Sequence, residues 1–131
     1  MKLIGAVLLF SQLAFAHSTI LGKWHSENTL LGRGVEFYLG FEFTETDMAV
    51  VVDCRFFDGA HLQASATSNV SYRYNDIIVH ETNDNTAKDG YHFCSATLRP
   101  SVWTAHIDGY GRTVLYAPVP YQSQFFLSRA Y

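Results

Sequence analysis

Six histidines are the residues of this chain best suited to acid–base or metal chemistry near neutral pH. No two of them form an H-x-x-x-H pair and no C-x-x-C occurs, so the spacing typical of zinc sites is missing. His80, His92 and His106 fall on separate predicted strands and could converge inside a closed sheet. Histidines scattered over the surface are the simpler interpretation, and the sequence predicts no metal site and no cofactor.

Other arrangements for catalysis are also missing from the sequence. There is no G-x-S-x-G motif, and Cys94 lacks the sequence context of a catalytic thiol. Glu36 and Glu42 would stand about 20 Å apart along one extended strand, too far for a glycosidase pair. The sequence therefore predicts no catalytic residue and favours a protein that is not an enzyme, with an interior histidine or tyrosine as the alternative.

The first residues indicate export. Lys2 precedes a mostly apolar run over residues 3–15, which ends in Ala14-Phe15-Ala16. Small residues at the first and third positions of that tripeptide predict a secretory signal peptide, residues 1–16, cleaved after Ala16. A membrane anchor is the alternative, but the run is shorter than the roughly 20 residues that a spanning helix needs. We expect a periplasmic or secreted protein with one domain, residues 17–131, and no membrane span in the mature chain.

Export makes the two cysteines a candidate disulfide, because such bonds persist in oxidising compartments. A Cys54–Cys94 bond would close a loop of about 40 residues and stabilise the fold by roughly 3–4 kcal/mol. Two buried free thiols are the alternative. The formal net charge of −3, with no basic stripe, argues against a nucleic-acid partner.

Strict alternation of apolar and polar residues identifies the elements that would carry these side chains. In residues 47–59, Met48, Val50, Val52, Cys54 and Phe56 share one parity, as expected for a strand with one buried face. Residues 35–44 alternate in the same way, and most later segments follow the same pattern. A polar stretch rich in Asn and Asp, residues 83–90, is predicted to be a loop.

The expected fold is an all-β protein of eight to ten short strands joined mostly by tight turns. Hairpin-linked strands form an antiparallel up-and-down meander, and closing it into a β-barrel removes the exposed sheet edges. A two-sheet β-sandwich is the alternative architecture.

Two short features resemble the small lipocalin-like barrels of the calycin superfamily. Gly22-Lys23-Trp24 matches the G-x-W of their first strand, and Arg129 falls on the last strand. The resemblance implies that Trp24 closes one end of the barrel and that Arg129 packs over its indole. Such a cation–π contact contributes about 0.5–2 kcal/mol and would join the first strand to the last.

Binding is the function that this architecture favours. Aromatic residues make up 15% of the chain, and in a barrel they either fill the interior or surround an apolar guest. We expect a small apolar or amphipathic molecule as ligand, held in the barrel by Phe37, Phe41, Val50, Val52, Phe56, Trp103 and Tyr116. The alternative is a protein-binding module or inhibitor that uses the segments 83–90 and 108–111 on its surface.

Overall fold

The computed structural model describes residues 19–118 and 123–130. Eight antiparallel strands close into a barrel, as the sequence predicts. They are β1 (Gly22–Ser26), β3 (Val35–Phe43), β4 (Asp47–Phe56), β5 (His61–Arg73), β6 (Asp76–Val79), β9 (Ser101–Ile107), β10 (Thr113–Tyr116) and β11 (Gln124–Arg129). The predicted signal peptide, residues 1–16, lies outside the described residues and stays a prediction.

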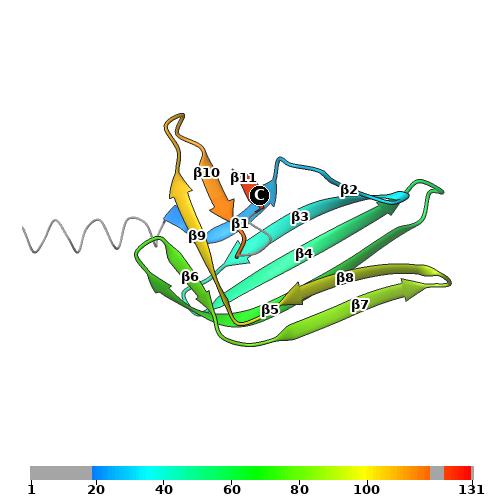
Figure 1. The fold of residues 1–131 in the computed structure, drawn as a ribbon, viewed down its shortest axis with the longest axis horizontal. Coiled ribbons are helices and arrows are strands. Elements are labelled where there is room, and N and C mark those ends of the chain that lie inside the picture. Colours follow the sequence, from blue (N-terminus) through cyan, green and yellow to red (C-terminus); the bar gives the residue numbers. More distant parts are fainter. Residues whose placement is uncertain (1–18, 119–122, 131) are drawn as a thin grey trace, which may run out of the picture.

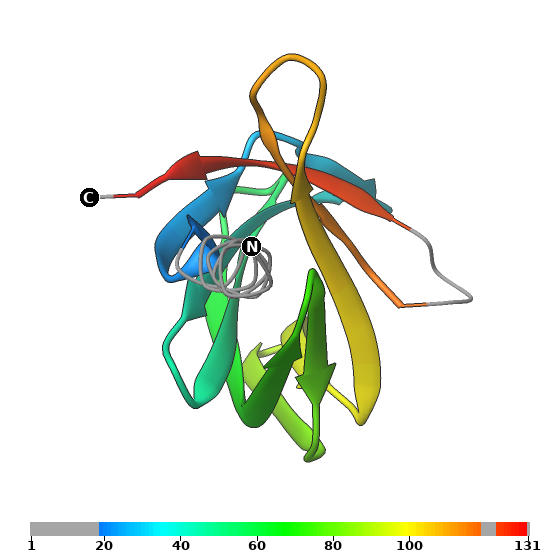
Figure 2. The ribbon, with the colours of Figure 1, turned by 90° about the vertical axis from the view of Figure 1, so that its left-hand side faces the viewer.

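The barrel closes because β1 pairs on both of its edges. One edge pairs with β11, with Trp24 opposite Arg129, and the other pairs with β3, with Trp24 opposite Phe41. Figure 2 looks at this end of the molecule and shows the last strand lying beside the first. The order β3-β4-β5-β6 and then β9-β10-β11 is an up-and-down meander, interrupted once between β6 and β9.

Side-chain alternation determines which face of each strand lies inside. In β4, every second residue from Met48 to Cys54 is buried, and in β5 the same holds from Ala64 to Val70. Because one face of these strands packs on the core, a shift of register by one residue would expose the whole apolar set. The parity predicted for residues 47–56 is the parity observed.

Three further strands complete the described fold: β2 (Leu30–Gly32), β7 (Asn83–Asp89) and β8 (His92–Leu98). Strand β2 pairs with the beginning of β3, while β7 and β8 form a separate two-stranded sheet. Figure 1 shows the long strands β3, β4 and β5 running beyond the barrel, with the β7–β8 hairpin beside them. We call this extension, made of β2, β7, β8 and the adjoining ends of β3, β4 and β5, the arm.

The segment predicted to be a polar loop, residues 83–90, is therefore mostly strand β7. Its amides contact the free edge of β5: Asn83 Nδ2 donates to Thr67 O at 2.9 Å and Asn85 Nδ2 to Ser65 O at 2.7 Å. On this edge β6 pairs only with the last residues of β5, so no strand ladder supplies backbone donors to Ser65 O and Thr67 O. The two asparagine amides supply these donors instead. Tertiary contacts thus override the turn-like composition of this segment.

Cys54 of β4 and Cys94 of β8 form the predicted disulfide, with Cα atoms 5.9 Å apart. Both cysteines are fully buried between the two layers of the arm. The bond is consistent with an exported protein. Within the described part of the chain, no helix is long and apolar enough to cross a membrane.

Candidate functional site

Trp24 is buried where β1 pairs with both β11 and β3. Its indole N–H donates to Ile20 O at 2.7 Å, and the Arg129 guanidinium lies 3.9 Å from the ring centre. Arg129 also donates to the backbone oxygens of Thr19 (2.8 Å) and Leu21. The position before Lys23 requires glycine, because Gly22 has φ +118° and a Cβ there would lie 2.6 Å from Arg129 Nη1. The stacking of Arg129 on Trp24 is the contact that the lipocalin-like resemblance implies, while closure of the barrel end by Trp24 stays a prediction.

Aromatic rings fill the barrel beside Trp24. Phe41, only 2% exposed, packs edge-on against Trp103 with ring centres 6.1 Å apart and against Phe125 at 5.5 Å. Val50 and Val52, also named as lining residues, are buried in the same core. At this level the side chains themselves occupy the barrel interior.

The other predicted lining residues lie elsewhere. Phe37 and Phe56 are half-buried in the arm, where the Phe56 ring packs 4.5 Å from that of His92. Tyr116 is half-buried and stacks on His106 with ring centres 4.9 Å apart. Of the seven predicted residues, only Trp103 borders a pocket described below.

That pocket opens at the barrel mouth beside the β8–β9 connection and has a volume of about 600 Å³. Its apolar lining residues include Leu98, Trp103 and Phe125, and the last two pack on Phe41 of the core. Its remaining lining residues come from the two connections around it: Thr97, Arg99, Pro100, Ser101, Ala117, Pro118 and Ser123. We call it the mouth pocket.

Trp103, which borders the mouth pocket, carries an unusual polar atom. Its indole Nε1 is buried and has no hydrogen-bond partner among the described residues. The indole N–H is only a donor, and a buried donor without an acceptor costs about 1–3 kcal/mol. By contrast, the indole N–H of Trp24 is paired with Ile20 O. The two tryptophans of the chain therefore differ in this respect.

A smaller pocket of about 250 Å³ lies at the opposite mouth of the barrel. It is bordered by Thr19, Ile20, Asn75, Ala105, His106, Ile107 and Thr113. Because Thr19 is the first described residue, the chain that precedes this pocket lies outside the described part.

The histidines that the structure describes do not gather at one place. His61 pairs with Asp53, His92 with Asp58 at 2.6 Å, and His80 with Ser71 at 2.6 Å. His106 instead stacks on Tyr116. Among the residues that the structure describes, no three His, Cys, Asp or Glu side chains are close enough to hold a metal ion.

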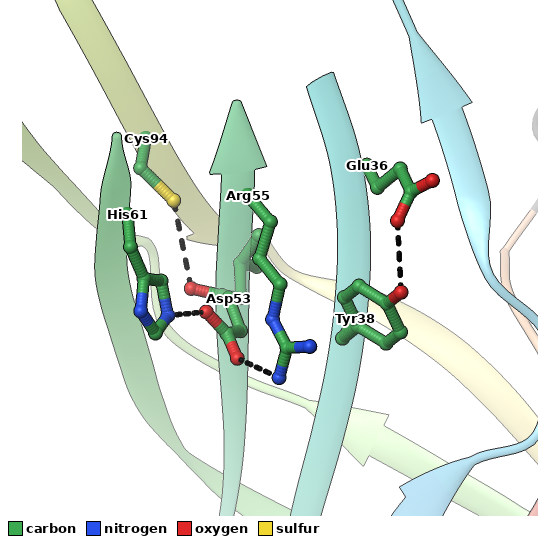
Figure 3. A network of polar contacts seen from close by, with 7 residues as sticks. Glu36, Tyr38, Asp53, Arg55, His61 and Cys94 are labelled. Carbon is green, nitrogen blue, oxygen red and sulfur yellow. Dashed lines mark hydrogen bonds and ion pairs between the residues drawn. The ribbon is translucent and has the colours of Figure 1, made fainter. Parts of the chain in front are cut away.

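Figure 3 shows a polar network on the outer face of the arm, across β3, β4 and β5. Asp53 accepts from both His61 and Arg55, and the Arg55 guanidinium lies 4.3 Å above the Tyr38 ring. The Tyr38 hydroxyl donates to Glu36 at 2.8 Å, and this bond raises the pKa of Tyr38. A tyrosine whose pKa is raised stays protonated near neutral pH, so it is a poor candidate for a nucleophile or general base. The network links three strands, and its residues border neither pocket.

Sequence reasoning named Trp103 but missed Leu98, Arg99 and Phe125 as pocket residues. These residues lie on β8, on the β8–β9 connection and on β11, so only the closed barrel brings them together. The one local signal for these residues is Pro100, because proline disfavours strand pairing and so marks the connection between β8 and β9 that borders the pocket.

Comparison of this chain with models of known families, with curated proteins and with solved structures finds no match. The closed antiparallel barrel is compatible with the lipocalin-like architecture.

Proposed function

We propose that this protein is an exported, non-enzymatic binding protein that takes a small amphipathic molecule into the mouth pocket. The observation that carries the proposal is the open mouth pocket bordered by Trp103, a residue whose buried indole N–H lacks an acceptor among the described residues. Native proteins pair almost all such buried donors, and exceptions commonly mark functional positions. The lipocalin-like resemblance of Trp24 and Arg129 supports the same function.

The apolar part of the ligand would rest on Leu98, Trp103 and Phe125. Small-molecule sites are typically concave, mostly apolar and supplied with a few polar groups that fix orientation. The volume of about 600 Å³ falls within the range of such pockets, which is about 300–1,000 Å³. The ligand would bind in this open pocket, next to the packed aromatic rings of the barrel core.

The polar part of the ligand would carry a hydrogen-bond acceptor. Trp103 offers a donor, and Arg99 adds a positive charge that has no ion-pair partner among residues 19–118 and 123–130. A carboxylate accepts from both kinds of donor and is bound strongly by arginine. A medium-chain fatty acid such as decanoate fits these requirements.

The two tryptophans allow an internally controlled test by two-dimensional NMR of nitrogen-labelled protein titrated with decanoate. We expect the indole signal of Trp103 to move downfield as it gains an acceptor. The indole signal of Trp24 should stay in place, because its N–H is already bonded to Ile20 O. Movement of neither signal, or of Trp24 alone, would contradict the proposal.

Two variants sharpen the test. Trp103→Phe removes the donor but keeps the aromatic surface, and the loss of one hydrogen bond to a charged group predicts decanoate binding weakened by about tenfold or more. Arg33→Gln is the matched control for Arg99→Gln, since Arg33 lies in the β2–β3 turn of the arm. Arg99→Gln should weaken binding while Arg33→Gln leaves it unchanged. Equal effects of the two arginine variants would exclude the mouth pocket as the site.

A further inference from the structure

The end of the arm exposes an unusual number of apolar side chains. Three turns meet there: Phe57 N donates to Gly34 O at 3.0 Å, which joins the β4–β5 turn to the β2–β3 turn. The contact of His92 with Asp58 joins the β7–β8 turn to the same place. Figure 1 shows these turns together at the end farthest from the barrel strands β9 and β10. We call this end the tip.

Four large apolar side chains of the tip are exposed: Leu31 by 73%, Phe57 by 68%, Tyr91 by 85% and Phe93 by 55%. Single exposed apolar residues are normal on a protein surface, whereas several at one place mark an interaction site. These four side chains do not belong to the core of the arm, which is formed by other residues, among them Cys54, Ala96 and Leu98. The fold therefore does not explain why they are apolar.

These side chains surround the tip on all sides. Leu31 is opposite Glu36 and so shares the outer sheet face that carries Tyr38 and Arg55. Phe93 is opposite Lys88 on the outer face of the hairpin, the side away from buried Cys94. Phe57 and Tyr91 lie in the turns between these two faces. A flat protein surface could cover one face only, whereas a medium that surrounds the tip covers all four residues at once.

The tip also lies next to a disulfide and is close to electrically neutral. The Cys54–Cys94 disulfide joins its two layers, so insertion would cost little ordering of the chain. Arg33 and Lys88 add positive charge, which Asp58 and Asp89 balance, and the Lys88 amine lies 5.7 Å from the Phe93 ring centre. Aromatic rings with polar edges and nearby basic side chains are enriched where proteins meet the bilayer interface.

We propose that the tip docks end-on into the interface of a lipid bilayer, driven by its apolar side chains and not by net charge. The arm would enter the headgroup region without crossing the membrane. The ligand pocket at the barrel mouth would stay outside the bilayer. This inference does not depend on the ligand proposed above.

Flotation of the oxidised protein with phosphatidylcholine vesicles tests the proposal. We expect the wild type to float and Phe57→Ser/Tyr91→Ser to lose at least about tenfold in partitioning, since two exposed rings no longer leave water. Tyr110→Ser is the matched control, because Tyr110 is 88% exposed in the β9–β10 turn of the barrel. It should float like the wild type. Thermal unfolding of each variant checks that the fold is intact.

A reporter variant shows directly which residues enter the bilayer. Tyr91→Trp should be quenched by lipids brominated in their acyl chains, whereas Tyr110→Trp should not. The native Trp24 and Trp103 belong to the barrel and contribute the same background to both variants. Failure of the wild type to float, equal flotation of the double variant, or quenching of Tyr110→Trp alone would overturn the proposal. Tip-dependent self-association without flotation would also overturn it and would assign the tip to a second copy of this chain.

Discussion

The barrel and the arm are both antiparallel β-structure, but different forces hold them together. In the barrel each strand pairs with a neighbour on both edges, and the ring closes where β1 meets β3 and β11. In the arm the β7–β8 hairpin has no backbone ladder to β5. It contacts β5 through Asn side chains and a buried apolar layer, and one disulfide joins it to β4. Closure makes the barrel independent of covalent bonds, whereas the hairpin depends on its bond to β4.

This difference also separates the two proposed interactions. The mouth pocket takes Trp103 and Phe125 from strands of the closed ring and Leu98 from the end of β8. The tip lies at the other end of the hairpin and needs the hairpin in place to present Tyr91 and Phe93. Damage near the tip should therefore leave the response of Trp103, which lies on β9, measurable.

The largest effect is expected from Phe41→Ala in the barrel core. Phe41 contacts both Trp103 and Phe125, and truncating a buried phenylalanine costs about 3–5 kcal/mol of unfolding free energy. Urea unfolding measures the change. Leu31→Ala at the exposed tip is the control and should stay within about 0.5 kcal/mol of the wild type. A similar loss in both variants would mean that the barrel interior is not the packed core described here.

Removal of the disulfide should have the next largest effect and should act on the arm. Cys54→Ala/Cys94→Ala reopens a loop spanned by a sequence separation of 40 residues, for which loop-closure entropy predicts a loss of about 4 kcal/mol. Phosphatidylcholine flotation should fall in the same variant, because the tip loses its support. The downfield movement of the Trp103 indole signal with decanoate should persist. Loss of the decanoate response together with flotation would show that the two regions fold as one unit.

Arg129→Met tests the closure of the barrel. It removes the cation–π contact with Trp24 and two bonds to backbone oxygens, at an expected cost of about 1–2 kcal/mol for an exposed side chain. Chemical denaturation measures the change, and Arg33→Met on the arm should have no measurable effect. An unchanged stability in Arg129→Met would mean that the stacked pair does not help to hold β1 against β11.

Asn85→Ala tests how the hairpin contacts β5. It leaves Ser65 O without its 2.7 Å partner and should cost about 1 kcal/mol. Gln63→Ala on the exposed face of β5 is the control and should cost less than about 0.5 kcal/mol. Equal effects would indicate that the amide contact is not specific.

The smallest effect is a pH dependence of the tip. Backbone donation from Ala60 N–H, followed by the contact with His92, holds the pKa of Asp58 below its ordinary value. A depressed carboxyl pKa adds stability above the unfolded pKa of about 3.9, and this stability is lost as the pH falls through the lower folded value. Acid unfolding of Asp58→Asn should therefore depend less on pH below about 4 than that of the wild type. An identical pH profile would contradict this role.

The sequence predicted the barrel because each of its long strands buries one face. Burial of one face makes apolar and polar residues alternate along the strand, and this alternation can be recognised in the sequence. It did not predict the arm, since β7 reads as a polar loop and becomes a strand only through its partners β5 and β8. The position of Tyr116 was equally hard to assign. Val114 and Leu115 are both buried, so the alternation that would reveal the inward face is missing in β10.

Local sequence patterns could not predict the residues of the mouth pocket, for a different reason. Leu98, Arg99 and Phe125 come from separate segments, and their convergence depends on the insertion of β7–β8 between β6 and β9. An unpaired indole N–H is likewise a property of the folded environment and not of the residue type. The disulfide could be predicted without the fold, because the chain has just two cysteines, and the structure decides between the bond and two free thiols.

Hydrogen exchange of the oxidised and the reduced protein, compared strand by strand, tests most directly whether the two regions are held independently. We predict that reduction of Cys54–Cys94 accelerates exchange in β7 and β8 at least about tenfold, while the amides of β1, β9, β10 and β11 keep their protection. Uniform acceleration in all strands, or unchanged protection in β7 and β8, would contradict this division of the molecule.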